Sequence, residues 1–303
     1  MKIMRFIGIV FALFSAGSPS DTSAQDSGKK YKVYMVSNSH LDTQWRWDVK
    51  ATIDDYLYNT AVQNLALLEK YPHYVFNFEG AVKYEWIKEY YPHLFERIRK
   101  FVADGRWNIS GASFEANDPN MPSSESFIRN ILLAQEFYKK EFGIKSKDMF
   151  LPDCFGFSQV MPTLGHHCGL IGFSTQKLSW RTEPLVGDSK TPFPIGLWEG
   201  VDGARIMVAL EPGRYSWNEF PEGDLSANEE LAESARKSPF GIAYRYYGNK
   251  LANGAGDHGG SALPRSIQLL EEGITNGKGP VQLVSATSSQ LYEDYMPYGN
   301  HPE

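Results

Sequence analysis

The stretch YKVYMVSNSHLDTQW, residues 31–45, joins an apolar run to a cluster of polar side chains. Apolar and polar residues alternate from Lys32 to about Ser37, which predicts a β-strand. His40 and Asp42 follow directly where this strand ends. Side chains two residues apart in an extended segment point the same way, so both can reach one ion. This pair is open to two interpretations, a solvated strand end and part of a divalent-metal site.

Beyond this stretch, strand-like and helical segments alternate, and the short connections between them predict an α/β fold with a parallel sheet or barrel. The predicted strands are 74–80, 106–113, 148–153 and 172–176, and the predicted helices are 53–72, 81–105 with a break at Pro92, 123–143 and 161–170. The less periodic region 181–250 predicts long surface segments. In parallel α/β folds the chemistry gathers at the carboxyl ends of strands, so Asp153 is expected to meet His40 and Asp42.

Composition bounds the class of protein. The chain has 303 residues, 42% of them hydrophobic, and a formal net charge of −6. This is typical of a globular protein with a large core, and it gives no general attraction to nucleic acid or to anionic membranes. Cys154 and Cys168 are interpreted as packing residues, because a zinc site built on two cysteines needs two further ligands.

The N-terminus predicts export. Lys2 and Arg5 precede a short apolar segment, and small residues before Gln25 suit cleavage after Ala24. The apolar segment is shorter than the roughly 20 residues that span a bilayer. We therefore expect residues 1–24 to be a signal peptide, residues 25–303 to be the mature domain, and the protein to be periplasmic or extracellular.

Four segments in order resemble glycoside hydrolase family 38, the class II α-mannosidases. They are SNSHLDTQWRW (37–47), DGRWNISGASFEANDPNMPSSESFIRNILLAQEFYKKEFG (104–143), FLPDCFGFSQVMPTLGHHCGLIGFSTQKLSW (150–180) and NGAGDHGGSALPRS (253–266). The likeness extends from about Tyr31 to about Tyr295. It implies a parallel-strand (β/α)7-type barrel and a zinc-dependent retaining α-mannosidase acting on terminal α-mannosyl residues of glycans or oligosaccharides.

The resemblance also implies a role for each matching residue. His40, Asp42 and Asp153 match zinc ligands, and Asp153 also matches the nucleophile. Trp45 and Phe155 match aromatic residues of the sugar pocket. The remaining assignment is Asp257, which matches a candidate general acid/base; its other interpretation is a turn residue between glycines.

The chain is shorter than family members, which continue into helical and β-sandwich regions. The resemblance therefore implies a truncated gene or fragment with an incomplete barrel, and it leaves the fourth zinc ligand unidentified. Two alternatives stay open. A metal-dependent polysaccharide deacetylase would use similar ligands to activate a water, and a sugar-binding fragment would bind mannose without turnover. Linkage specificity and oligomeric state are not predicted.

Overall fold

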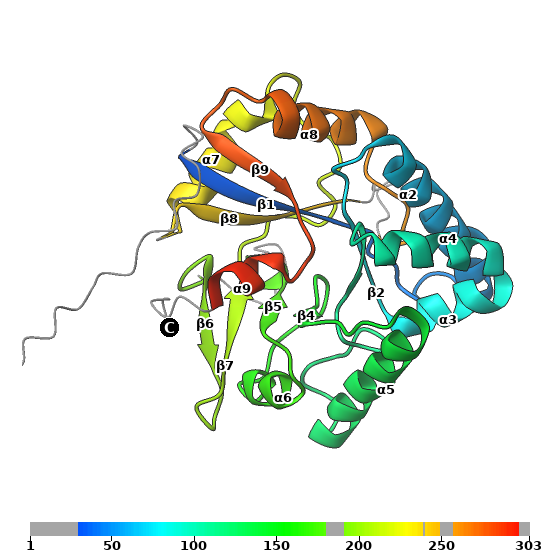
Figure 1. Ribbon diagram of the computed structural model, residues 1–303. Helices are drawn as coiled ribbons and strands as arrows, with labels where there is room; N and C mark the ends of the chain where they lie inside the picture. Colours follow the sequence, from blue (N-terminus) through cyan, green and yellow to red (C-terminus); the bar gives the residue numbers. More distant parts are fainter. Residues whose placement is uncertain (1–29, 180–190, 239, 249–256, 297–303) are drawn as a thin grey trace, which may run out of the picture.

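The computed structural model describes residues 30–179, 191–238, 240–248 and 257–296, in which strands and helices alternate (Figure 1). The strands are β1 (Tyr31–Asn38), β2 (Phe76–Glu79), β3 (Trp107–Ser110), β4 (Asp148–Phe150), β5 (Gly172–Ser174), β6 (Ile195–Glu199), β7 (Arg205–Ala209), β8 (Ile242–Gly248) and β9 (Val281–Ser285). The α-helices are α1 (Val49–Ala51), α2 (Tyr58–Lys70), α3 (Ala81–Tyr90), α4 (Pro92–Ala103), α5 (Ser124–Phe142), α6 (Met161–His167), α7 (Glu229–Arg236), α8 (Pro264–Asn276) and α9 (Gln290–Tyr295). A π-helical segment, η1 (Thr52–Leu57), and two 3₁₀ segments, η2 (Lys177–Ser179) and η3 (Leu225–Ala227), complete the described elements.

The strands form two sheets. The first has the order β3-β2-β1-β8, with β9 pairing with the first half of β1, and all of its pairings are parallel. The second has the order β4-β5-β7-β6, parallel except for the β6–β7 pairing. The sheets adjoin where the backbone N–H of Ala112 donates to the carbonyl of Asp148 at 2.9 Å. The predicted parallel α/β fold is confirmed, while a complete seven-stranded barrel stays a prediction.

Strand β1 is buried on both faces, which explains how it can anchor the site. Val33 and Met35 belong to one apolar cluster, which the helices α2, α3, α4 and α8 also line, while Tyr34 and Val36 belong to another. This second cluster includes Leu291 and Tyr292 of α9, the helix that lies between the two sheets in Figure 1. The alternation in the sequence of β1 therefore separates two cores.

The prediction of long irregular segments at 181–250 holds for only part of the described region. Residues 210–224 carry no helix or strand, but β6, β7, α7 and β8 also lie there, and β8 pairs with β1 from Lys32 to Asn38. The predicted signal peptide lies outside the described residues. No helix within the described ranges is both long and apolar enough to cross a membrane.

Candidate functional site

The segment after β1 carries His40 and Asp42 into a sheltered position. The side chain of His40 is only 5% exposed. Asp257 and its neighbours pair with this segment: the N–H of Asp42 donates to the carbonyl of Asp257 at 2.8 Å, and the N–H of Gly259 donates to the carbonyl of His40 at 2.9 Å. A stretch more than 200 residues away in sequence thus fixes the backbone of the His-x-Asp pair.

Asp153 lies three residues beyond the end of β4, close to the predicted position. Lys177 of η2 places its Nζ 2.5 Å from Asp153 Oδ1 and 4.1 Å from the centroid of the Phe155 ring. The lysine is only 2% exposed. A buried ammonium group without a counter-charge would be costly, so this pair fixes both side chains.

Asp257 has a backbone conformation that is unusual for an aspartate. Its φ is +76°, and no other non-glycine residue in the described ranges has a positive φ. Its carboxylate accepts a hydrogen bond from the hydroxyl of Tyr215, and the same hydroxyl lies 3.3 Å from Asp153 Oδ1. Strained residues of this kind concentrate at functional sites. Tyr215 therefore links the two carboxylates that were predicted to be catalytic.

Burial raises the pKa of the Tyr215 phenol, and the charge of Asp153 and the hydrogen bond to Asp257 raise it further. The phenol consequently stays protonated and donates hydrogen bonds. Its ring lies against the His40 imidazole, with 5.0 Å between the centroids. Tyr215 thus packs against one predicted site residue and donates toward two others.

The predicted metal ligands come together around His40. One ligand atom each of His40, Asp153 and Asp257 lie within 4.8 Å of one another. His40 Nε2 is 3.3 Å from Asp42 Oδ1 and 3.9 Å from Asp153 Oδ2. Asp42 therefore adjoins the group, and Asp257, predicted as an acid/base, is a member of it. Imidazole nitrogen and carboxylate oxygen are ligands that zinc accepts, so the donor set fits such an ion.

The electrostatics of the site also suit a cation. Burial lowers the pKa of His40, but the hydrogen bond to Asp42 and the charges of Asp153, Asp42 and Glu79 outweigh it, so the net pKa is raised. Among the described side chains around His40, carboxylates outnumber ammonium groups. The carboxylates belong to Asp42, Asp153, Asp257 and Glu79, and the ammonium groups belong to Lys83 and Lys177. An excess of negative charge of this kind favours a bound dication.

The two aromatic residues predicted to bind sugar are both accessible. Trp45 is 50% exposed and Phe155 is 45% exposed. Large apolar rings at such exposure offer flat faces to a ligand. His258 instead packs with Trp47 and Tyr56, at centroid distances of 5.6 and 5.1 Å.

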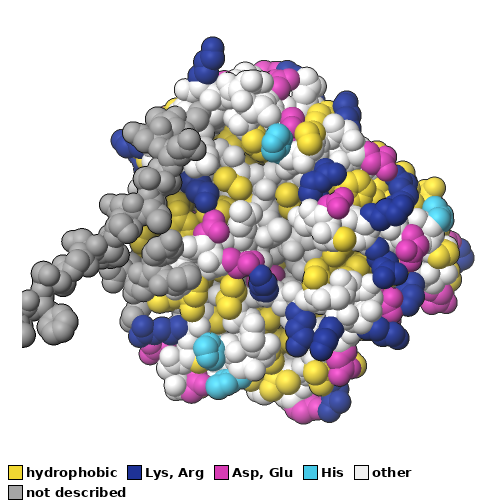
Figure 2. All heavy atoms as spheres, in the orientation of Figure 1, with side chains coloured by type: hydrophobic (Ala, Val, Ile, Leu, Met, Phe, Trp, Pro, Cys, Tyr) yellow, Lys and Arg dark blue, Asp and Glu magenta, His cyan; other side chains and the backbone are white. Residues whose placement is uncertain are grey.

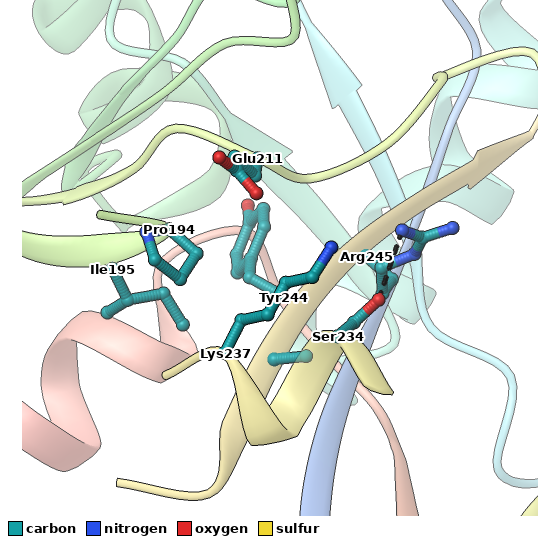
Figure 3. A pocket seen from close by; sticks show the side chains of 8 residues that line it. Pro194, Ile195, Glu211, Ser234, Lys237, Tyr244 and Arg245 are labelled. Atoms are coloured by element: carbon teal, nitrogen blue, oxygen red, sulfur yellow. Dashed lines mark hydrogen bonds between the residues drawn. The ribbon is translucent and has the colours of Figure 1, made fainter. Parts of the chain in front are cut away.

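Two other surface features carry no candidate chemistry. The cavity between β6, α7 and β8 that Figure 3 shows has a volume of about 70 Å³. Ligand pockets usually have about 300 Å³ or more. Figure 2 shows basic and acidic side chains interspersed over one face, and this face therefore has no single-sign patch of the kind that binds nucleic acid.

Lys177 and Tyr215 are site residues that the sequence analysis missed. Lys177 lies in the TQKLSW portion of the stretch 150–180, and the family resemblance of that stretch is the signal that could have singled it out. Tyr215 lies in a region without clear periodicity, and no spacing signal pointed to it.

Comparisons with known proteins identify the family of this chain. The family described as Glycosyl hydrolases family 38 N-terminal domain matches residues 30–295. Alpha-mannosidase G of Dictyostelium discoideum is 31% identical over 276 residues, and Alpha-mannosidase 2C1 of Homo sapiens is 32% identical over 265 residues. These matches cover 91% and 87% of this chain but 24% of each relative. The chain therefore spans about a quarter of the length of these relatives.

A solved structure shares the fold. The crystal structure of an alpha-mannosidase from Enterococcus faecalis V583 superimposes with a TM-score of 0.71 and 22% sequence identity. The match covers 90% of this chain and 30% of that chain. The described strands and helices therefore follow an arrangement known from a larger protein.

Proposed function

We propose that this chain, which belongs to glycosyl hydrolase family 38, forms the catalytic part of a zinc-dependent retaining α-mannosidase. Its substrates are terminal α-mannosyl residues of glycans or oligosaccharides. The observation that carries the proposal is the convergence of His40, Asp153 and Asp257 within 4.8 Å. The names of the related α-mannosidases support the substrate class.

The two aspartates at the site take the two roles that retention requires. Asp153 attacks the anomeric carbon while Asp257 gives its proton to the leaving glycosidic oxygen. Asp257 then removes a proton from water, which attacks the anomeric carbon and releases Asp153. Retaining enzymes hold these carboxyl groups about 5–5.5 Å apart, and here one oxygen of Asp153 lies within 4.8 Å of one oxygen of Asp257. Tyr215 and Lys177 orient Asp153 for attack.

His40, Asp42 and Asp153 would hold the zinc ion. The ion, when bound, supplies a Lewis acid beside the hydroxyls of the sugar. Trp45 and Phe155 provide faces for the sugar ring. We also propose that the two sheets belong to a (β/α)7-type barrel and that residues 1–24 direct export to the periplasm or the medium.

Three variants test the catalytic roles. Asp153→Ala should abolish hydrolysis of an aryl α-mannoside, and His40→Ala should lower the zinc content before it lowers the amount of folded protein. The exposed Asp104 lies beyond α4, so Asp104→Asn is the matched control and should keep wild-type turnover. Normal turnover by Asp153→Ala would contradict the proposal.

The role of Asp257 has its own test. Asp257→Asn should lose far more activity on a mannoside with a poor leaving group than on one with an activated leaving group, because only the former needs the proton. NMR of the first product should show the α-anomer. Acetate release from an acetylated glycan without glycosidic cleavage would instead favour a deacetylase, and mannose binding without turnover a sugar-binding fragment.

A further inference from the structure

A buried ion pair lies behind His40, on the side away from Asp153. Glu79 is the last residue of β2 and Lys83 lies in the first turns of α3. Lys83 is fully buried and Glu79 is 6% exposed, and Lys83 Nζ lies 2.8 Å from Glu79 Oε1. Gly80, with φ +90°, closes the turn between them, and a Cβ there would lie 3.3 Å from Lys83 Cε. The local backbone is therefore shaped around the lysine.

The two ring nitrogens of His40 face different groups. Nε2 faces Asp42 and Asp153, while Nδ1 faces Glu79 Oε1 at 3.9 Å. A histidine that binds a metal through one nitrogen usually directs the other nitrogen to a carboxylate or carbonyl, which fixes its tautomer and orientation. Glu79 is the carboxylate that faces Nδ1, at a distance somewhat longer than a hydrogen bond, and it has the chemistry for that second role.

Lys83 keeps Glu79 in this position. Burial lowers the pKa of Lys83, but the charges of Glu79 and Glu115 and the hydrogen bond to Glu79 raise it above its ordinary value. Burial raises the pKa of Glu115, which lies in the same network. Lys83 therefore stays an ammonium group and directs the carboxylate of Glu79.

A purely structural role is the competing explanation. Apolar residues of similar volume often replace a buried ion pair at no cost in stability. Stability alone therefore gives little reason for placing two charges beside a histidine, whereas a carboxylate there can orient the ring.

We propose that Glu79, held by Lys83, is a positioning residue that sets the tautomer of His40, with the proton on Nδ1 and the lone pair of Nε2 directed to the metal. This inference rests on the proposed function, because it assigns His40 to a metal. It adds the group that orients that ligand.

The test measures metal affinity directly, by titrating the metal-free full-length chain with Co²⁺ and following absorption. Glu79→Gln removes the charge, and the double variant Glu79→Leu with Lys83→Met replaces the pair by apolar side chains and should remain folded. Both should weaken binding about 10- to 100-fold. The control is Glu141→Gln, which removes the 2.7 Å ion pair between Glu141 and Lys88 of α3 and should leave the affinity unchanged.

A second readout follows the ring directly. The ¹⁵N shifts of the His40 ring in the Zn²⁺-loaded wild-type chain should show a metal-bound Nε2 and a protonated Nδ1, and the double variant should lose this arrangement. A metal-bound Nδ1 in the wild type, or equal Co²⁺ affinity in all chains, would overturn the inference alone. A wild-type chain that binds neither Co²⁺ nor Zn²⁺ would overturn the proposed function together with it.

Discussion

Lys177 places a buried ammonium group against the candidate nucleophile. Its Nζ is 2.5 Å from Asp153 Oδ1 and it lies over the ring of Phe155. Immobilising the four methylene groups of a lysine side chain normally costs conformational entropy, but burial and the Phe155 ring already confine this side chain. The lysine can therefore hold one oxygen of Asp153 while the other faces His40 Nε2 at 3.9 Å.

Lys177→Gln should lower kcat/KM on an aryl α-mannoside about 10- to 100-fold. Hydrogen bonds to charged groups contribute roughly 1.5–3 kcal/mol, and about 1.4 kcal/mol corresponds to a tenfold change in rate. The control Lys88→Gln changes a lysine that is 47% exposed in its ion pair with Glu141, and it should keep wild-type kinetics. Equal kcat/KM for both variants would show that Lys177 does not orient Asp153.

The spacing of residues along a strand and the positions of the strand ends predicted much of the site, because both can be read from short stretches of sequence. His40 and Asp42 needed only the two-residue period of a strand, and Asp153 needed only the rule that parallel strands end at one edge. Tyr215 could not be predicted in this way. Its hydroxyl reaches Asp153 and Asp257 through tertiary packing that no short-range pattern encodes.

At the scale of elements, α9 is the helix that fills the space between the sheets. Tyr292 of α9 is fully buried, and its hydroxyl donates to the carbonyl of Phe173 at 2.9 Å. Gly172 of β5 allows this approach, because a Cβ there would lie 1.9 Å from Tyr292 Cδ2. The glycine is thus required by close packing between β5 and α9.

Gly172→Ala should destabilise the protein by about 1–3 kcal/mol, the usual cost of overpacking a core. The clash is with the aromatic ring, so the same substitution made in a Tyr292→Leu background should cost much less. Urea unfolding of the four chains measures this coupling. An identical cost in both backgrounds would mean that the ring of Tyr292 is not what Gly172 accommodates.

Local signals predicted several elements and missed others for a physical reason. Pro92 separates α3 from α4, as its sequence signature indicated, and Ser123 caps α5 by accepting from the N–H of Ser126. Strand β8 was missed because it is buried on both faces and carries tyrosines, so it shows no alternation. Its identity depends on its pairing with β1, a contact between segments about 210 residues apart.

At the scale of the whole molecule, Asp148 ties the two sheets together. It is the first residue of β4, and its Oδ1 accepts from the N–H of Gly111 at 3.1 Å, just beyond β3. The carboxyl group is almost fully buried. Burial raises its pKa from 3.8 to about 6, although hydrogen bonds from Ser288, Gly111 and Ser146 oppose the rise. The junction between the sheets therefore contains a carboxyl group whose ionised form is disfavoured in the folded protein.

The sign of the resulting pH dependence follows from the raised pKa. The folded state binds the proton of Asp148 more tightly than the unfolded state does. The binding of this proton therefore stabilises the folded state in full below pH 3.8, and the stabilisation is lost as the pH rises through about 6. The difference between the two pKa values corresponds to about 3 kcal/mol. Asp148→Asn keeps an oxygen for the Gly111 N–H and removes the titration.

Urea unfolding at pH 4, 5, 6 and 8 tests this prediction. The free energy of unfolding of the wild type, relative to Asp148→Asn, should fall by up to about 3 kcal/mol across this series. Because both chains share all other titrating groups, their difference isolates Asp148. A matched Asp104→Asn variant, changed at an exposed aspartate, should show a difference that varies little with pH. A flat Asp148→Asn difference would mean that the carboxyl group between the sheets is not desolvated, and that water reaches the junction of β3 and β4.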